Sequence, residues 1–120
     1  MKAQEPASPH AWVQEFPGSV TVCDAQGIIL EMNDRSAEVF ADDGGRALIG
    51  TNLLDCHPQA ARAKLEGMLA SRERNVYTIE KAGLKKLIYQ TPWYANGEFA
   101  GFIEMALEIP FEMPHFVRAP

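Results

Sequence analysis

Asn96-Gly97 separates two long apolar runs near the end of the sequence. Both residues tolerate the positive φ angles of a type I′ turn, so the pair is a strong short-range signal for a β-hairpin. The flanking runs predict strands at 84–94 (L-K-K-L-I-Y-Q-T-P-W-Y) and 99–109 (F-A-G-F-I-E-M-A-L-E-I). Another strand is predicted at 75–80 (N-V-Y-T-I-E), followed by a turn at K-A-G. This part of the chain is therefore predicted to form three consecutive antiparallel strands.

Pro92 falls inside one of these predicted strands. Proline has no N–H to donate, so it is expected only where a strand lacks a neighbour. If the chain turns at 81–83, the strand at 75–80 ends before it reaches Pro92. We therefore predict that Pro92 has a strand neighbour on one side only.

The middle of the chain has the period of a helix. The apolar residues that recur at helical spacing are Ala61, Leu65, Met68 and Leu69. Pro58 suits a first helical position, where a missing N–H is no loss. The pattern predicts one amphipathic helix over about 58–72.

Two more strands are predicted before this helix. The run S-V-T-V-C-D-A-Q-G-I-I-L-E-M-N at 19–33 has two extended segments joined by the turn D-A-Q-G. Asn33 or Asp34 can cap a short helix after it. D-D-G-G at 42–45 is predicted to end that helix rather than to bind calcium, because the other ligands of a calcium loop are missing.

Composition excludes several functions. The chain has 120 residues, which suits one domain, and its net charge of −5 argues against general binding to nucleic acid. It lacks a signal peptide and an apolar run long enough to span a membrane, so we expect a cytoplasmic protein. No catalytic motif is present, so we do not expect an enzyme.

The order of two strands, a helical middle and three strands indicates an α+β fold. Three fragments resemble PAS domains, which are small sensor modules: V-T-V-C-D-A-Q-G-I-I-L-E-M-N, L-I-G-T-N-L-L-D-C-H-P and Y-Q-T-P-W-Y-A-N-G-E-F-A-G-F-I-E-M-A-L-E-I. The resemblance covers residues 16–109. It leaves an N-terminal segment with a short helix at 1–15 and a C-terminal tail at 110–120. The tail is similar to a bacterial subgroup of unassigned function, sometimes fused behind a hemerythrin-like domain.

The resemblance implies a five-stranded antiparallel sheet in the order 2-1-5-4-3 with helices packed on one face. It also implies a role in signal transduction, through small-molecule sensing or protein–protein contact. In PAS domains, a cavity between the sheet and the long helix can hold haem, flavin, a metabolite or nothing. The alternatives for this chain are therefore a small-molecule sensor, a ligand-free interaction module, and a haem-based gas or redox sensor.

Cys56-His57 lies at the predicted start of the long helix. His57 is the histidine available as a haem ligand, although related haem ligands lie further into the helix. A redox thiol or a metal site are other readings, but the favoured one is that Asp55 or His57 caps the helix. Flavin is not expected, because the reactive-cysteine stretch of light-sensing relatives is missing.

Two opposite assignments of the inward face are open for the strand at 84–94. Alternation of polarity alone places the large apolar side chains of 86–94 inside. The resemblance favours the opposite register, in which Gln90 and Glu104 face the cavity. In that register the candidate ligand-binding residues are His57, Cys23, Thr78, Gln90 and Glu104. The outer face then carries an apolar interface for a homodimer, or for the chain's own N-terminal helix. The candidate interface residues are Trp12, Leu87, Tyr89, Trp93, Ile103 and Met105.

Overall fold

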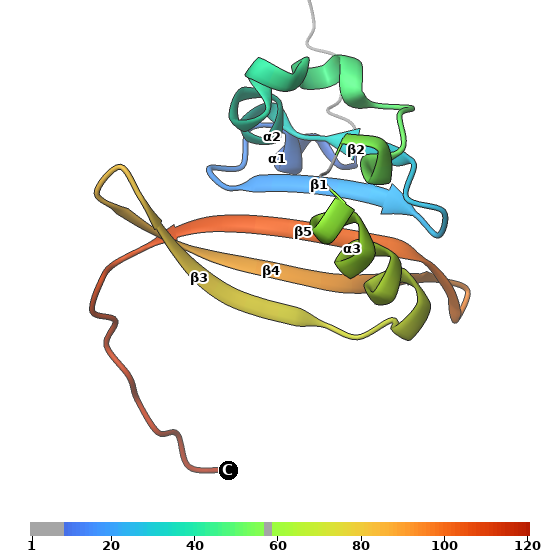
Figure 1. Ribbon diagram of the computed structural model, residues 1–120. Coiled ribbons are helices and arrows are strands. Elements are labelled where there is room, and N and C mark those ends of the chain that lie inside the picture. The colour runs from blue at the N-terminus through green and yellow to red at the C-terminus, as the bar shows by residue number, and fades with distance from the viewer. Residues whose placement is uncertain (1–8, 57–58) are drawn as a thin grey trace, which may run out of the picture.

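A five-stranded antiparallel sheet forms the body of the computed structural model, which describes residues 9–56 and 59–120. Its spatial order is β2-β1-β5-β4-β3 (Figure 1). The strands are β1 (Ser19–Asp24), β2 (Ile29–Met32), β3 (Asn75–Lys81), β4 (Leu84–Ala95) and β5 (Glu98–Ile109). The predicted α+β class and strand order are confirmed.

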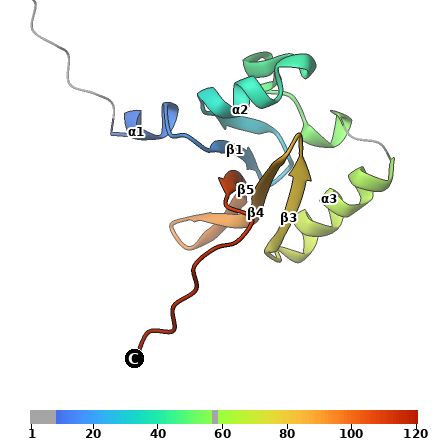
Figure 2. The same ribbon diagram turned by 90° about the vertical axis from the view of Figure 1, so that its left-hand side faces the viewer.

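The helices lie mainly on one side of this sheet. They are α1 (Ala11–Gln14), α2 (Asp34–Val39) and α3 (Gln59–Ser71), with short 3-10 turns η1 (Ala41–Asp43), η2 (Gly45–Leu48) and η3 (Leu53–Cys56). Figure 2 shows α2 and α3 on one side, which we call the inner face, and α1 towards the other side, the outer face. Within the described ranges, each helix is too short or too polar to cross a lipid bilayer.

Asn33 joins the first strands to the helices. Its Oδ1 accepts from the backbone N–H groups of Ser36 (3.0 Å) and Val20 (2.9 Å), and its Nδ2 donates to the carbonyl oxygens of Gly18 (2.8 Å) and Val13 (3.0 Å). The predicted cap of α2 is therefore Asn33. Since the side chain is only 3% exposed, the same amide also fixes β1 and the end of α1.

The β4–β5 hairpin turns at Asn96 and Gly97, whose φ angles are 53° and 81°. These are the positive values expected of the pair. The ladder between β3 and β4 ends at the pairing of Asn75 with Gln90, so Pro92 pairs only with β5. The prediction that Pro92 has one strand neighbour is confirmed.

The α3 helix is held mainly at its edges. None of its residues is buried, although the apolar residues predicted to face inward, Leu65, Met68 and Leu69, are half-buried. The Lys64 ammonium lies 5.6 Å from the centre of the Tyr77 ring. Just after the C-terminal end of α3, the Arg72 guanidinium lies 4.5 Å from the centre of the Phe99 ring. The apolar stripe of α3 therefore faces the sheet without packing tightly on it.

Candidate ligand cavity

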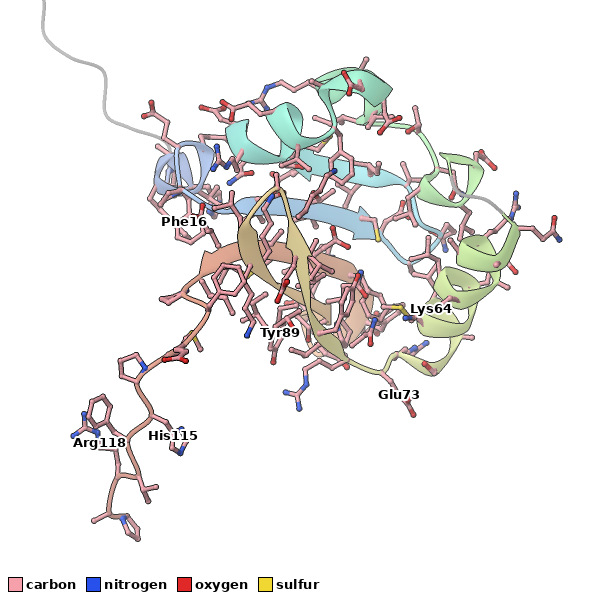
Figure 3. All side chains as sticks on the ribbon, turned by 60° about the vertical axis from the view of Figure 1, so that its left-hand side comes forward. Phe16, Lys64, Glu73, Tyr89, His115 and Arg118 are labelled. Carbon is pink, nitrogen blue, oxygen red and sulfur yellow. The ribbon has the colours of Figure 1, made fainter. Side chains whose placement is uncertain are left out.

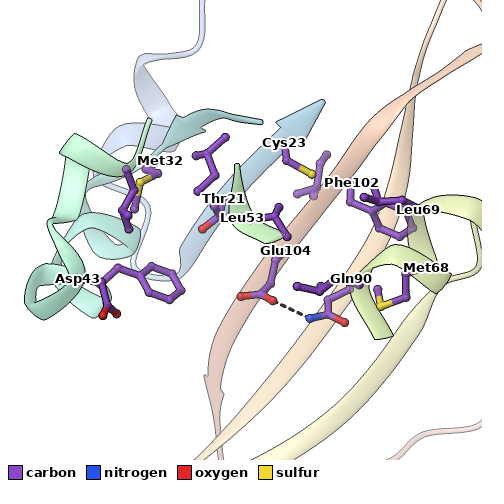
Figure 4. A pocket seen from close by; sticks show the side chains of 15 residues that line it. Thr21, Cys23, Met32, Asp43, Leu53, Met68, Leu69, Gln90, Phe102 and Glu104 are labelled. Atoms are coloured by element: carbon purple, nitrogen blue, oxygen red, sulfur yellow. Dashed lines mark hydrogen bonds between the residues drawn. The ribbon is translucent and has the colours of Figure 1, made fainter. Parts of the chain in front are cut away.

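A cavity of about 200 Å³ lies between the inner face of the sheet and α3 (Figure 4). Its walls are mostly apolar and come from β1, β2, β4, β5, the 3-10 turns and α3. The lining residues are Thr21, Cys23, Ile29, Met32, Phe40, Asp43, Leu48, Leu53, Leu65, Met68, Leu69, Gln90, Phe102, Ile103 and Glu104. The cavity is where the PAS resemblance predicted one.

A carboxylate and an amide stand side by side on the sheet wall of this cavity. Gln90 on β4 pairs with Glu104 on β5. The Gln90 Nε2 donates to Glu104 Oε2 over 2.6 Å, as Figure 4 shows, and Gln90 Oε1 accepts from Asn75 Nδ2 over 2.9 Å. Gln90 is 9% exposed, and these bonds offset the cost of burying its amide.

The inner-face register predicted by resemblance is therefore the observed one. Gln90, Phe102 and Glu104 all line the cavity, and Ile88 is buried on the same face of β4. The register that alternation alone favours would have placed Gln90 in solvent. Asn75, which orients the Gln90 amide, was missed in the sequence. The role of Asn75 can be recognised only after the β3–β4 register is known, because that register pairs Asn75 directly with Gln90.

Thr78 is a correction. It pairs with Leu87 and therefore lies on the outer face, away from the cavity. The neighbouring Tyr77 pairs with Ile88 and faces inward instead. Burial raises the pKa of Tyr77, the charge of Glu104 raises it further, and a hydrogen bond from the side chain of Gln90 opposes the rise. The β3 residues close to the polar pair are therefore Asn75 and Tyr77, rather than Thr78.

Cys23 lies on the cavity wall, as predicted, and is buried. Burial raises the pKa of its thiol, so the reactive thiolate is disfavoured at neutral pH. It behaves here as a small apolar side chain. Above it, the hydroxyl groups of Thr21 and Ser36 share a hydrogen bond of 2.6 Å, which ties the inner face of β1 to α2.

The predicted site at His57 lies outside the described residues, as does Pro58. The haem hypothesis can still be compared with the described part of the cavity wall, where no histidine is among the lining residues. Haem is usually held by histidine, although cysteine and methionine are also ligands, and Cys23, Met32 and Met68 are present. Among the residues that the structure describes, no group of three or more His, Cys, Asp or Glu side chains could hold a metal ion.

Asp42 and Asp43 lie in η1, directly after α2. Gly44 follows with a φ of 116°, a left-handed conformation that suits glycine. α2 itself ends at Val39, so D-D-G-G ends the following turn η1 rather than α2 as predicted.

The outer face of the sheet carries the predicted interface residues. Leu87 and Tyr89 on β4 lie beside Leu107 and Met105 on β5, and all are half-buried. Trp93 is additionally anchored, because its Nε1 donates to the carbonyl oxygen of Cys23 over 3.0 Å. The remaining candidates are Trp12 on α1, which is 71% exposed, and Ile103, which is half-buried and also borders the cavity.

The tail after β5 carries large apolar side chains in solvent. Phe111, Met113, Phe116 and Val117 are all exposed. Figure 3 shows His115 and Arg118 on this tail, away from the sheet. The sequence predicted coil here, and the structure has no helix or strand after Ile109.

No known family model matches this sequence, and it matches none of the curated proteins. Solved structures resemble it in fold. The C-terminal domain of a Streptococcus mutans protein is 17% identical, with a TM-score of 0.67 over 88% of this chain and 92% of that one. The PAS domain of BvgS from Bordetella pertussis is 19% identical, with a TM-score of 0.59 over 84% and 83% of the two chains.

The third example is the Aer2 receptor from Vibrio cholerae, described as a dual PAS-heme oxygen sensor. It is 17% identical, with a TM-score of 0.56 over 78% of this chain and 95% of that one. At sequence identities this low, the structural similarity shows a shared fold. It does not indicate which ligand each protein binds. None of the three descriptions mentions hemerythrin, so the predicted link to hemerythrin-fused proteins stays a prediction.

Proposed function

We propose that this chain, which has the fold of a PAS domain, is a sensory signalling module that binds a small molecule between its sheet and α3. The proposed role is non-catalytic, and the cytoplasm is the proposed location. The observation that carries the proposal is the incomplete packing of α3. Its apolar stripe faces a cavity of about 200 Å³, and no residue of the helix is buried.

A ligand in this cavity would complete the apolar contact between Leu65, Met68 and Leu69 and the inner face. The binding free energy gained from this contact would depend on how close α3 lies to the sheet. Ligand binding would therefore favour one position of α3 over another, which is the differential affinity that a sensor needs. At its edges α3 is held by the cation–π contacts of Lys64 and Arg72, which lie in solvent and are worth only about 0.5–1 kcal/mol each.

Native mass spectrometry of the purified protein tests this proposal. We expect a population whose mass exceeds that of the chain, and the extra mass should disappear under denaturing conditions. Met68→Trp should abolish the extra mass, because the larger side chain fills the cavity. Ala63→Trp places the same side chain on the exposed side of α3 and should keep it. A spectrum showing only the bare chain, with no change in melting temperature across a metabolite library, would leave the ligand-free interaction module as the better reading.

Haem is the cofactor that the fold suggests and that Aer2 is described as holding. Among the described residues no histidine lines the cavity, so this part of the wall supports haem poorly. The absorption spectrum of the same sample provides the comparison. A Soret band would favour the haem sensor over the ligand we propose.

The proposal includes a homodimer formed through the outer face. The support for this assembly is the set of half-buried apolar side chains on the outer face. Of the described helices, only the short α1 lies towards that face (Figure 2). Met105→Glu is the cleanest test, because Trp93 also holds the Cys23 carbonyl and its loss would disturb the fold. We expect light scattering to show a dimer for the wild type and for Ala63→Glu, and a monomer for Met105→Glu. An unchanged dimer in Met105→Glu would contradict this interface.

A further inference from the structure

We infer that the cavity ligand is a compact, mostly apolar molecule with one amine that is cationic at neutral pH, and that the amine donates to Glu104. This inference rests on the proposed function, because it names the chemical class of the molecule that the cavity binds. Three observations carry it: the fixed orientation of the polar pair, the lack of a cationic partner for Glu104 among the described residues, and the size and composition of the cavity.

The polar wall of the cavity is built to accept hydrogen bonds. Asn75 donates to Gln90 Oε1, so the Gln90 Nε2 must turn towards Glu104. If the Gln90 amide were flipped, its Oε1 would face Glu104 Oε2 and its Nε2 would face Asn75 Nδ2, so neither contact would be a hydrogen bond. One N–H of the Gln90 amide therefore donates to Glu104 Oε2. No other hydrogen bond to the Glu104 carboxylate occurs in the described part of the chain, which leaves Oε1 available as an acceptor.

The carboxylate of Glu104 has no counter-ion within residues 9–56 and 59–120. Among the described residues, no Lys, Arg or His nitrogen lies within 4.0 Å of it. Lys86, Arg35 and Lys81 border a second hollow that Glu104 also touches, but none of them reaches salt-bridge distance. A carboxylate beside apolar walls is favoured by a nearby cation, and hydrogen bonds between two charged groups are stronger than neutral ones. The missing partner is thus a cation supplied by the ligand.

The rest of the cavity sets the size and polarity of the ligand. Phe102, Leu65, Met68 and Leu69 surround the space next to the polar pair. An apolar cavity of about 150 Å³ is known to accept benzene, and this one measures about 200 Å³. One ring with a short aminomethyl arm would fill it. Asp43 on η1 is the second carboxylate on the wall, so the net charge of the lining also favours a cation.

Three probes of nearly equal size separate the contributions: benzylamine, toluene and benzoate. Their affinities are measured by calorimetry or by ligand-observed NMR on the full chain at pH 7. We expect benzylamine to bind on the order of tenfold more tightly than toluene, and benzoate to bind least. Glu104→Gln should remove most of the benzylamine advantage and leave toluene within about twofold. Glu108→Gln, on the same strand but exposed, is the matched control and should change neither affinity.

The alternatives are distinguishable. Equal binding of toluene and benzylamine, or tighter binding of benzoate, would overturn the cationic class while leaving a ligand-binding cavity. Absence of binding by all three probes would overturn this inference, and the native mass spectrum then decides separately on the proposed function. If Glu104→Gln fails to fold, the wild-type chain suffices: the carboxyl ¹³C resonance of Glu104 should move with benzylamine and stay with toluene. If the chemical shift of this resonance does not change on addition of benzylamine, the inference is also overturned.

Discussion

Replacing Asn33 by Ala should destabilise the fold far more than the loss of a helix cap. In the native chain one amide makes four hydrogen bonds, two as acceptor and two as donor. Losing an N-cap costs about 1 kcal/mol. The carbonyl of Gly18 is buried, and leaving a buried group unpaired costs about 1–3 kcal/mol more. The N–H of Val20 and the carbonyl of Val13 are partly buried, so water can replace some of what they lose.

The expected loss for Asn33→Ala is therefore about 3–4 kcal/mol, which is a large part of the 5–15 kcal/mol that stabilises a typical domain. Asn33→Ser keeps an oxygen for the Ser36 N–H but cannot reach Gly18 and Val13. It should recover only the cap, about 1 kcal/mol. Asp34→Ala is the neighbouring control, because its ion pair with Arg46 is exposed and worth at most about 1 kcal/mol.

Urea unfolding followed by circular dichroism measures all three variants against the wild type. The slope of the free energy against urea concentration should stay constant, so that the midpoint reports stability. If Asn33→Ala costs no more than Asp34→Ala, or if Asn33→Ser is as stable as the wild type, the amide acts only as a cap. The account of Asn33 as the link between α1, β1 and α2 would then be wrong.

Other expected outcomes concern the backbone and the buried thiol. Gly101→Ala should cost more than about 3 kcal/mol in urea unfolding, because Gly101 has a φ of 145° and an added Cβ would overlap the Cys23 carbonyl oxygen. Gly67→Ala, in open space on α3, should instead stabilise by about 1 kcal/mol. Because burial raises the pKa of Cys23 above its ordinary 9.0, the unfolded chain loses this proton first, and stability should fall as the pH rises above 9. Cys23→Ala should flatten that decline between pH 8 and 10, and an unchanged slope would contradict the assignment. With Cys56→Ser as background, a thiol reagent should react with Cys23 slowly in the folded chain and rapidly in urea.

Much of the fold was predictable because local chemistry and global structure agree. Asn96-Gly97 adopts the positive φ angles that only a few residues tolerate, so it marks a turn wherever it stands between strands. Asn33 is a preferred cap before a short helix, and it is the observed cap. Pro92 could be placed because its missing N–H forbids a second neighbour, and the β3–β4 ladder ends before it. Each of these residues carries its own structural requirement.

The cavity residues were harder to predict, because their environment depends on partners far away in sequence. Thr78 and Tyr77 differ by one position, and only the β3–β4 register decides which of them faces inward. Asn75 has no distinctive sequence context, yet it sets the orientation of the Gln90 amide. The large side chains of Tyr89 and Trp93 suggested a core, although they lie on the outer face. Alternation of polarity misleads here because the outer face is as apolar as the inner one.

A single extra residue in β5 explains why the polar pair exists. Next to the turn, Ala95 pairs with Glu98 and Tyr94 with Phe99, a register that would bring Gln90 opposite Ile103 if it continued. The register shifts between Trp93 and Tyr94, and Gln90 then pairs with Glu104. Such a bulge inserts one residue and changes which side chains share a face.

Gly101 is what permits this shift, because its φ of 145° and its close approach to β1 leave no room for a side chain. After the bulge, Phe102 and Glu104 face the cavity, and the Phe99 ring lies 6.0 Å from that of Phe102. Gln90 gains a carboxylate partner for its donor, so both polar groups can stand on an otherwise apolar wall. The backbone irregularity at Gly101 and the acceptor site at Glu104 are therefore one structural feature, and the glycine requirement arises from the geometry that builds the site.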